Sequence, residues 1–445
     1  MSGTCIVGAG ITGLCAAWSI TRKGGACTVL ESAPQVGGAL STQRRNGFLA
    51  EEGPHSIQLE SSDVENFLKS VPGLYNQIIE ARPYANRRYI VRNNKPVAVP
   101  MSPLQALRTP LWSTRAKLGL LREPFIRPAD PSVEESVAAF VRRRLGNEFY
   151  QYAINPLVGG IYAGNPERLS LRHAFPKLHT MEQEHGSLLR GMLARQRATR
   201  KQASSQTRKR IITFRDGIDT LPHKIAQALG QRVQTGVSID SIQKNGEGWQ
   251  IQWNGRQETF ERLVLSIPAF ALNKLPLPSD LLEMLTPLET IEYPPLSVLS
   301  LGFQRSQVAH PLDGFGLLVP ECEGRKILGV LFPSSVFADR APKDSVLLTV
   351  FVGGTRNPRQ ATEDTEELQQ TVLPELDSLL GISGQPGFLH HKHWPLAIPQ
   401  YNLGYGSLLR QIETIENSFP GLQLLGNYRS GISLKECLLT GLNLS

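Results

Sequence analysis

Cysteine is scarce in this chain: five residues are spread over 445 positions, and no two of them are separated by only two residues. This odd number and irregular spacing favour neither a disulfide framework nor a zinc site, so we expect a reducing compartment and no metal. No stretch of about 18 uninterrupted apolar residues occurs, so a membrane-spanning helix is not predicted. No basic segment followed by an apolar one opens the chain, so we expect no secretion signal.

Charge of either sign is also modest. Charged residues make up 19% of the chain and hydrophobic residues 40%, which excludes a disordered polyelectrolyte. Lysine and arginine total 47 against 39 acidic residues, and this net charge of +8 would suit nucleic acid, an anionic membrane or an acidic substrate. No nucleic-acid-binding motif accompanies the charge, so we expect no nucleic acid partner. The length is that of two or three domains.

Recognisable catalytic groups are missing as well. The nine histidines are scattered apart from His390, His391 and His393, and in a strand only two of these three would share a face. Ordinary polar residues near a strand end therefore explain them better than a metal site. A chain without an evident acid–base pair, triad or metal cluster is typical of chemistry that a bound cofactor carries.

A strand, a helix and a second strand are predicted at the start of the chain. Thr4–Val7 and Thr28–Glu31 are short apolar runs of the kind found in buried strands, and apolar residues between 14 and 20 recur at helical spacing. Gly24 and Gly25 end that helix. Such a βαβ beginning predicts a parallel sheet covered by helices, and hence an α/β fold.

A glycine pattern between this first strand and the helix indicates a dinucleotide site. The first glycine permits a tight turn, the second lets the backbone approach a pyrophosphate, and the third lets the helix lie close to the strand. Amides at the helix N-terminus can then hold the phosphates. An acid ends the second strand, where its carboxylate can accept the ribose hydroxyls. The residues expected to bind the cofactor here are Gly8, Gly10, Ile11, Thr12, Gly13 and Glu31.

Two further features favour FAD over NAD. Gly37 and Gly38 follow the acid closely and would bring the backbone beside the dinucleotide a second time, and the run Glu51–His55 comes next. Near the C-terminus, Leu424–Ile432 predicts another strand, turn and helix start. A second helix N-terminus at this point can stabilise the charge of a reduced flavin, which a simple NAD domain does not need.

In the rest of the chain, the composition and the predicted secondary structure change twice. Residues 85–206 are rich in Leu, Arg and Pro at mostly helical spacing, and 190–210 hold eight basic residues and no acid, which predicts disorder over 198–208. Strands then return. They are expected over Arg210–Phe214, Val233–Ile242, Trp249–Trp253 paired with Thr259–Leu265, Leu296–Phe303, Phe315–Val319, Ile327–Phe332, Val346–Val352 and Leu422–Leu425. Helices are expected over Glu366–Leu380 and from near Ser433.

Five motifs stand out along nearly the whole chain. They are Asn155–Pro166 with Leu169 and Ser170, Gly314–Pro320, Phe337–Pro342, Phe351–Gly354 and Gly426–Arg429. Together they resemble the protoporphyrinogen oxidase family, flavoproteins that share the fold of the monoamine oxidases. The resemblance implies a mixed α/β and α+β fold with a Rossmann-type FAD domain, a β-rich substrate domain and a helical membrane-docking domain. The implied boundaries are 1–84, 205–270 and 390–445 for the FAD domain, 85–92 and 271–389 for the substrate domain, and 93–204 for the helical domain.

The activity that the resemblance implies is oxidation of protoporphyrinogen IX to protoporphyrin IX in haem biosynthesis, with non-covalent FAD and with dioxygen as acceptor. Three rounds of hydride removal would complete the reaction, and the pyrrole protons can leave by tautomerisation. The resemblance also implies hand-over of the product to a ferrochelatase and is compatible with a homodimer. Three alternatives stay open: a coproporphyrinogen III oxidase, another flavin amine oxidase, and a flavin-binding factor without turnover.

The substrate is a flat apolar macrocycle with carboxylates, so its site needs an apolar slot with a cation at the rim. Arg88 matches a family arginine that binds a propionate, and Arg87 is the alternative in register. Phe315 matches a family aromatic that stacks on a substrate ring, and Leu296 a pocket leucine. His55 stands near flavin and substrate in the family, where plant members and some bacterial members carry Asn.

The resemblance further implies cofactor contacts outside the glycine turn. Val237 resembles a valine whose backbone pairs with adenine, and Trp394 lies in a stretch that is beside the flavin ring in the family. Ala39 stands where the family often has Lys or Arg, so a charged flavin contact is expected to be missing. The remaining residues expected at the cofactor are Gly37, Gly38, Gly53, Pro54, His55, Ser266, Gly426, Asn427 and Ile432.

The segment 100–127 combines apolar and basic residues. They are Leu104, Leu107, Leu111, Trp112, Leu118, Leu121 and Phe125 with Arg108, Arg115, Lys117, Arg122 and Arg127. This composition suits a surface docked into lipid with arginines at the headgroups, and it equally suits a helical subdomain buried against the rest of the chain. The resemblance favours the first, so we expect a cytoplasmic protein in peripheral contact with an anionic membrane.

Overall fold

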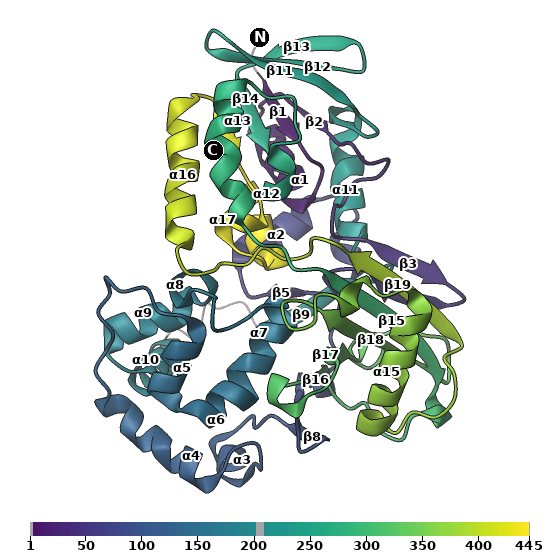
Figure 1. Cartoon of the computed structure of the whole chain (residues 1–445). Coiled ribbons are helices and arrows are strands. Elements are labelled where there is room, and N and C mark those ends of the chain that lie inside the picture. The colour runs from purple at the N-terminus through teal and green to yellow at the C-terminus, as the bar shows by residue number, and fades with distance from the viewer. Residues whose placement is uncertain (1–2, 202–208, 445) are drawn as a thin grey trace.

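A five-stranded parallel sheet occupies the upper part of the molecule (Figure 1) in the computed structural model, which describes residues 3–201 and 209–444. Its strand order is β10–β2–β1–β14–β20, and its neighbouring strands all pair in parallel. The strands are β1 (Thr4–Val7), β2 (Cys27–Leu30), β10 (Val233–Gln234), β14 (Arg262–Leu265) and β20 (Leu422–Leu424). Their continuous apolar sequences fit a sheet that is covered on both faces.

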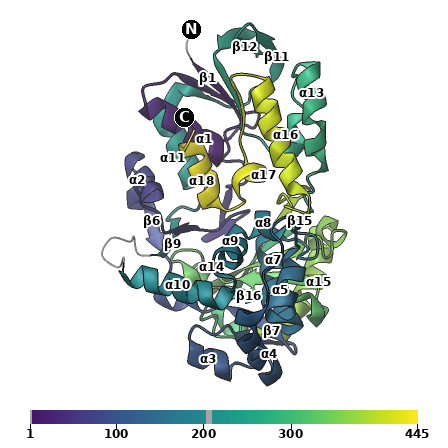
Figure 2. The same cartoon turned by 90° about the vertical axis from the view of Figure 1, so that its left-hand side faces the viewer.

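Helices from both ends of the chain pack together on this sheet. α1 (Ile11–Arg22) and α18 (Leu434–Leu442) lie side by side (Figure 2), with α11 (Thr220–Leu229) also against α1. The two backbones approach closely because a Cβ at Gly441 would lie 2.3 Å from the Thr12 carbonyl oxygen. The predicted helix start near Ser433 is confirmed, and the C-terminus completes the fold that the N-terminus begins.

A seven-stranded sheet forms the lower right of Figure 1, in the order β19–β15–β18–β17–β16–β7–β8. All its pairs are antiparallel except β7 with β16. The strands are β7 (Tyr89–Arg92), β8 (Lys95–Ala98), β15 (Leu296–Gln304), β16 (Gly316–Leu318), β17 (Ile327–Leu331), β18 (Ser345–Gly353) and β19 (Phe388–Trp394). Helix α15 (Thr365–Leu380) covers one face, because Leu368, Val372 and Leu376 recur every fourth residue and are buried.

Short helices make up the lower left of Figure 1. They are α3 (Pro103–Arg108), α4 (Thr114–Gly119), α5 (Val137–Leu145), α6 (Asn147–Phe149), α7 (Asn155–Tyr162), α8 (Leu171–Ala174), α9 (Pro176–His185) and α10 (Leu188–Lys201). Serines 102, 113 and 136 cap α3, α4 and α5 through their side chains. Both views place α3 and α4 at the opposite end of the molecule from β11 and β12 (Figures 1 and 2).

Smaller elements connect these parts. The remaining strands are β3 (Thr42–Arg45) paired with β4 (Phe48–Glu51), the sheet β5 (Ile57–Leu59), β9 (Arg210–Phe214) and β6 (Ile78–Glu80), and the sheet β11 (Ile239–Asn245), β12 (Gly248–Trp253) and β13 (Arg256–Phe260). The remaining helices are α2 (Ser62–Ser70), α12 (Ala269–Leu272), α13 (Ser279–Leu285), α14 (Pro333–Val336), α16 (Tyr405–Ser418) and α17 (Asn427–Ser430).

Two of the predicted strands were wrong in extent. The run Val233–Ile242 divides at a turn containing Gly236 (φ +65°), and its two parts join different sheets. The run Thr259–Leu265 divides in the same way: Thr259 pairs with β12, whereas Val264 pairs with β1. Apolar alternation cannot show such a division, because both parts are strands and only their distant partners differ.

Predicted disorder over 198–208 was wrong for 198–201, which belong to α10, and 202–208 lie outside the described residues.

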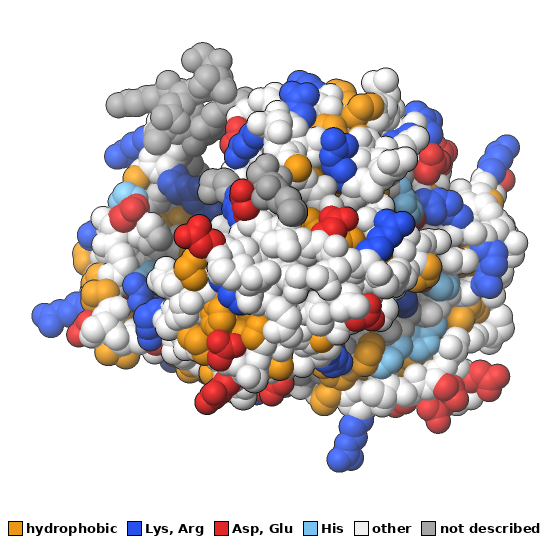
Figure 3. Space-filling view, turned by 90° about the horizontal axis from the view of Figure 1, so that it is seen from above, with side chains coloured by type: hydrophobic (Ala, Val, Ile, Leu, Met, Phe, Trp, Pro, Cys, Tyr) orange, Lys and Arg blue, Asp and Glu red, His pale blue; other side chains and the backbone are white. Residues whose placement is uncertain are grey.

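The domain boundaries stay a prediction. Within them, β8 forms a sheet edge inside 93–204, and β19 pairs with β15 on both sides of the expected boundary at 390. No helix among the described residues is long and apolar enough to cross a bilayer. On the face seen in Figure 3, Lys and Arg are interspersed with acidic and apolar side chains.

Candidate active site

The glycine turn after β1 is crowded on one side and open on the other. A Cβ at Gly8 (φ +103°) would lie 2.4 Å from the Ser266 carbonyl oxygen, and one at Gly13 would lie 2.1 Å from the Gly8 carbonyl oxygen. A Cβ at Gly10 would meet nothing within 4 Å. The first and third glycines therefore let the chain close up between β1, α1 and β14, while the second borders free space.

A second glycine pair lies beside this turn. Gly37 donates its amide to the Ala9 carbonyl oxygen at 2.9 Å, and a Cβ at Gly38 would lie 3.5 Å from the Gly10 Cα. Glu31 accepts the Ala9 amide at 2.7 Å through Oε2, and its carbonyl oxygen accepts the Val237 amide at 2.9 Å. The structure thus gathers the predicted cofactor residues of the first 40 positions, and Val237, at the carboxyl ends of β1 and β2.

The run Glu51–His55 is held beside these glycines from two directions. A Cβ at Gly53 would lie 2.3 Å from the Ala39 carbonyl oxygen, so Gly53 passes directly against the residue that follows the Gly37–Gly38 pair. On the other side, Trp394 Nε1 donates to the Glu52 carbonyl oxygen at 2.7 Å. The Glu52 carboxylate accepts His390 Nε2 at 2.8 Å and pairs with Lys392 at 3.2 Å. Strand β19 therefore fixes the position of this run.

The neighbouring histidines of β19 divide as expected for a strand. His391 and His393 both contact the Ser297 hydroxyl, at 2.9 and 3.4 Å, on the face opposite to His390. Ser297 in turn donates to the Ala361 carbonyl oxygen at 2.7 Å, and Thr365 contacts His391 at 3.0 Å. No group of three side chains that could hold a metal ion occurs among the described residues, and His391 ties the start of α15 to the sheet through Thr365.

The C-terminal motif lies next to β14. Gly426 adopts φ +155°, where a Cβ would lie 2.6 Å from the Tyr428 ring and 3.5 Å from the Ile267 carbonyl oxygen. The Tyr401 hydroxyl donates to the Asn427 carbonyl oxygen and accepts the Gly431 amide at 3.0 Å. Ile432 packs on the same core as β14 and β20. These contacts set the path of the chain between β20 and α18.

The predicted substrate residues fall into two neighbouring groups. Phe315 and His55 line one small pocket with a cavity volume of about 10 Å³. Leu296 lies outside it, in an apolar cluster that also contains Phe351 and Trp394. His55 bridges the two groups, because its ring meets the Phe351 ring edge-on at a centroid distance of 5.9 Å.

A cation stands over the pocket aromatic. The Arg88 guanidinium lies 5.3 Å from the centroid of the Phe315 ring, and among the described residues it donates only to the Asn86 carbonyl oxygen, at 3.3 Å. The neighbouring Arg87 is paired with Asp313, which also accepts the Tyr89 hydroxyl at 2.5 Å. Arg88 is exposed and has no carboxylate partner among the described residues, so it is the arginine of this pair that can bind an acidic ligand.

Comparison with known proteins gives the family of the chain. Residues 11–445 match the model of the flavin containing amine oxidoreductases. Protoporphyrinogen oxidase 2 of Arabidopsis thaliana is 33% identical over 98% of this chain and 91% of its own length. The chain belongs to the protoporphyrinogen oxidase family. Coproporphyrinogen III oxidase of Bacillus subtilis (strain 168) is 25% identical over 98% of this chain and 95% of its own length.

The fold agrees with this membership. A crystal structure of a protein from Exiguobacterium sp. 255-15 superposes with a TM-score of 0.81 at 23% identity, covering 100% of this chain and 97% of that one. The predicted fold class, an α/β fold of the flavin amine oxidase type, is confirmed. As a member of the protoporphyrinogen oxidase family, the protein is an oxidoreductase with FAD as its cofactor.

The residues around the glycine turn fit FAD. Twelve buried side-chain polar atoms have no hydrogen-bond partner among the described residues, and two of them, Ser266 Oγ and His55 Nε2, belong to the predicted cofactor set. Buried polar atoms are almost always satisfied, so these two point to a ligand. Free space borders Gly10, where the pattern expects the pyrophosphate. The turn, Glu31, Ser266 and the Gly53–His55 run would hold the FAD, which supplies a two-electron acceptor.

Two residues of the pocket were missed by the sequence reasoning. Glu51 and Arg340 are 3% and 2% exposed and line the same pocket as Phe315. Burial raises the pKa of Glu51 to about 7, while burial lowers the pKa of His55 to about 4. Glu51 stood in a run that was already singled out and Arg340 in the Phe337–Pro342 motif, but only packing brings them together.

Proposed function

We propose that the protein oxidises protoporphyrinogen IX to protoporphyrin IX in haem biosynthesis, with dioxygen reoxidising the flavin. The observation that carries the proposal is the Arg88 guanidinium over the Phe315 ring, at a pocket beside the predicted flavin residues. This juxtaposition offers a flat apolar surface for a pyrrole ring and one cation for a propionate at its edge. The 33% identity to the Arabidopsis thaliana protoporphyrinogen oxidase supports the same substrate.

The protein's part in this reaction is to bind and orient. Phe315 would stack on a pyrrole ring, Arg88 would hold a propionate through two parallel hydrogen bonds, and the Leu296 cluster would exclude water from the macrocycle. The Glu52 contacts with β19 keep His55 against this site. Hydride transfer itself requires no charged side chain at the reacting carbon, since the cofactor carries that chemistry.

Coproporphyrinogen III is the second candidate substrate, favoured by the 25% identity to the Bacillus subtilis enzyme. Its four carboxylates would need more cations at the rim, whereas Arg87 is paired with Asp313 and Arg82 donates to the Tyr84 hydroxyl and the Ser334 carbonyl oxygen.

Anaerobic mixing of the FAD-loaded protein with each porphyrinogen tests both candidate substrates. We expect protoporphyrinogen IX to bleach the flavin faster; faster bleaching by coproporphyrinogen III would reverse the assignment, and bleaching by neither would exclude both.

Replacing Arg88 with alanine is expected to weaken substrate binding. A charge-assisted contact is worth about 1.5–3 kcal/mol, a factor of roughly 10 to 150 in affinity. The loss should appear mainly as a raised KM, because a contact made equally in ground and transition states does not speed the chemical step. FAD content should stay unchanged. Steady-state kinetics with protoporphyrinogen IX provide the measurement.

The matched control is the adjacent Arg87→Ala, which removes the pair with Asp313 and should leave KM within a factor of a few. Arg88→Lys should restore only part of the affinity, since an ammonium cannot form the planar double contact. A raised KM for Arg87→Ala and a normal one for Arg88→Ala would move the propionate contact by one position. Normal values for both would exclude it.

The segment 100–127 presents an apolar surface, and we propose that it docks on an anionic membrane. Its outward side chains are Met101 (61% exposed), Leu104 (56%), Leu107 (70%), Leu118 (60%), Leu121 (69%) and Phe125 (82%). Arg108, Arg115, Arg122 and Arg127 are exposed on the same segment. Two residues of the predicted surface point inward instead: Leu111 is buried, and the Trp112 ring stacks on Phe149 at 4.7 Å. The Trp112 ring anchors the segment on α6, while the exposed side chains face outward.

Vesicle binding is the expected consequence. The protein should co-sediment with vesicles containing phosphatidylserine, and salt should weaken binding only partly, because apolar insertion is not screened while arginine attraction is. The double variant Leu121→Ser/Phe125→Ser should bind at least tenfold more weakly, at roughly 1.5–3 kcal/mol per buried large apolar side chain. The control Leu403→Ser, 48% exposed outside this segment, should bind normally. Equal binding by all three proteins would rule the segment out.

A further inference from the structure

The pocket under Phe315 contains two buried groups of opposite charge that do not form an ion pair. The Glu51 carboxylate accepts the Thr42 hydroxyl at 2.6 Å and the Ile218 amide at 3.0 Å. The Arg340 guanidinium donates to backbone carbonyl oxygens instead, those of Phe214 at 2.6 Å and Arg215 at 3.1 Å. Neither side chain has an ion-pair partner among the residues described. A buried carboxylate without an ion-pair partner is rare, because its charge is costly to bury.

A third group completes the pocket. His55 Nε2 is buried with no hydrogen-bond partner in the part of the chain that the structure describes, and the ring lines the same pocket as Glu51 and Phe315. Glu51 and His55 are four positions apart along a run that strand β19 holds in place through Glu52. The pocket wall is otherwise apolar, formed by Leu331, Pro333, Val336 and Phe337. The proton-accepting atoms of the pocket therefore belong to His55 and Glu51.

We propose that His55 and Glu51 carry away the proton that a substrate ring nitrogen loses at each oxidation, with Arg340 as a positioning residue. The inference rests on the proposed function. Bound FAD would accept a hydride from a bridging carbon in each of three rounds, and a ring N–H would then lose a proton. Tautomerisation moves the extra hydrogen of the fourth bridging carbon to a ring nitrogen, so that three hydrides and three protons leave in all. In each round the ring N–H bond breaks, its electron pair stays on the ring nitrogen, and a new N–H bond forms at His55 Nε2. The proton would then pass to the Glu51 carboxylate, which lines the same pocket.

The charges around these groups suit this direction of transfer. Burial, ahead of the charge of Arg340, lowers the pKa of His55 to about 4, so the imidazole is neutral and holds a proton only briefly. Burial raises the pKa of Glu51 to about 7, although Thr42, Arg340 and the Ile218 amide act against it. The nearby Asp219 adds to the increase, and is itself paired with Arg44 at 2.5 Å. Glu51 is thus the better proton acceptor of the two and titrates near neutral pH.

The test compares four FAD-loaded proteins: the parent, Glu51→Gln, His55→Asn and the control Glu258→Gln, which lies exposed on β13. Each is mixed anaerobically with protoporphyrinogen IX between pH 5.5 and 8.5 while flavin absorbance is followed. We expect the parent rate to rise through an ionisation near pH 7. Glu51→Gln and His55→Asn should be slower by about 10²-fold, with the pH dependence lost in Glu51→Gln, and the control should match the parent.

A second measurement needs no substrate. Because the folded-state pKa of Glu51 is raised, its contribution to stability is full below the unfolded pKa of about 4.5 and is lost as pH rises through about 7. Glu51→Gln should therefore flatten the fall in denaturant stability between pH 5 and 8, and Glu258→Gln should not. An unchanged pH dependence of stability in Glu51→Gln would show that Glu51 does not titrate there, and would overturn the relay.

The outcomes separate the two proposals. If neither porphyrinogen bleaches the parent flavin, the proposed function fails. If the parent is bleached and Glu51→Gln keeps its rate and pH profile, the relay fails and the function stands. If His55→Asn releases FAD and regains the parent rate when FAD is added in excess, His55 serves the cofactor and the relay is overturned. In Arg340→Lys, the ionisation seen in the pH dependence of the bleaching rate should move to higher pH without loss of FAD. An unshifted pH dependence would exclude a positioning role for Arg340.

Discussion

Gly13→Ala is expected to yield protein without bound FAD and with reduced stability. The new Cβ would lie 2.1 Å from the Gly8 carbonyl oxygen and 3.2 Å from the Ser266 Cβ. No rotamer relieves this clash, because the opposing atom is backbone, so α1 must move away from β1 and β14. Overpacking of this kind costs about 1–3 kcal/mol or more. Flavin absorbance of the purified protein and its thermal unfolding midpoint are the two measurements.

Gly10→Ala is the matched control for the cofactor. Its backbone (φ −66°, ψ 171°) suits alanine, and the Cβ would meet nothing within 4 Å. The FAD-free protein should therefore unfold at the parent's temperature, whereas FAD affinity should fall because the methyl group occupies the space expected for the pyrophosphate. Parent-like FAD affinity in Gly10→Ala would place the pyrophosphate elsewhere. Parent-like flavin content in Gly13→Ala would contradict the need for close packing at that turn.

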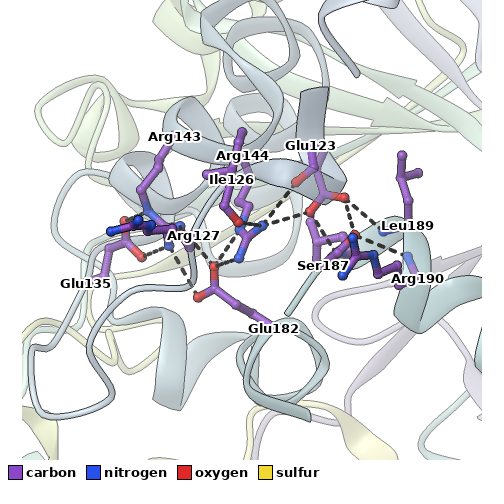
Figure 4. Close-up of polar contacts among 11 residues, drawn as sticks. Glu123, Ile126, Arg127, Glu135, Arg143, Arg144, Glu182, Ser187, Leu189 and Arg190 are labelled. Atoms are coloured by element: carbon purple, nitrogen blue, oxygen red, sulfur yellow. Dashed lines mark hydrogen bonds and ion pairs between the residues drawn. The ribbon is translucent and has the colours of Figure 1, made fainter. Parts of the chain in front are cut away.

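Arg144→Ala is expected to be the most destabilising substitution among the helices α5–α10. The Arg144 side chain is fully buried and pairs with Glu123 at 3.2 Å and with Glu182 at 2.5 Å (Figure 4). Glu123 also accepts the Ser187 hydroxyl at 2.5 Å and the Leu188 amide at 2.8 Å, at the start of α10. Removing the guanidinium leaves buried carboxylates without their partner, which costs about 3–5 kcal/mol.

A neighbouring arginine provides the comparison. Arg142, on the same helix as Arg144, pairs with Glu167 in the turn before α8. Both side chains are more than 40% exposed, so Arg142→Ala should cost about 0–1 kcal/mol. Urea unfolding of the FAD-loaded proteins, followed by circular dichroism, measures both. Equal losses for the two variants would contradict the dominance of burial. Arg144→Ala should also loosen the segment 100–127, because Glu123 connects that segment to α9 and α10 through this network.

Local patterns account for the parts of the fold that short stretches of sequence can specify. The β1–α1–β2 unit, helix α15 and strand β18 were predicted to within a few residues, because period and glycine placement act over one or two turns. The glycine pattern also predicted the cofactor. Family membership confirms that prediction, because this family uses FAD. The resemblance selected Arg88 and Phe315, and the structure brings these two together.

The misses have a common cause in partners that are distant in the chain. The runs that divide at Gly236 and near Glu261 look continuous, because alternation does not reveal which sheet a strand joins. Leu111 and Trp112 could not be told from Leu104 and Phe125, since all four are apolar and only packing against Phe149 turns two of them inward. Composition alone left both readings of that segment open.

By itself, the sequence determined the βαβ start, its glycine turn and the family, all of which depend on residues close together or on motifs matched one by one. Only the tertiary structure decided that Glu51, His55 and Arg340 share one pocket with Phe315. It also decided that Asp313 forms an ion pair with Arg87, whereas Arg88 can bind an acidic ligand. The physical reason is that charge and pKa depend on burial and on neighbours in space, and neither is a property of a residue's position in the chain.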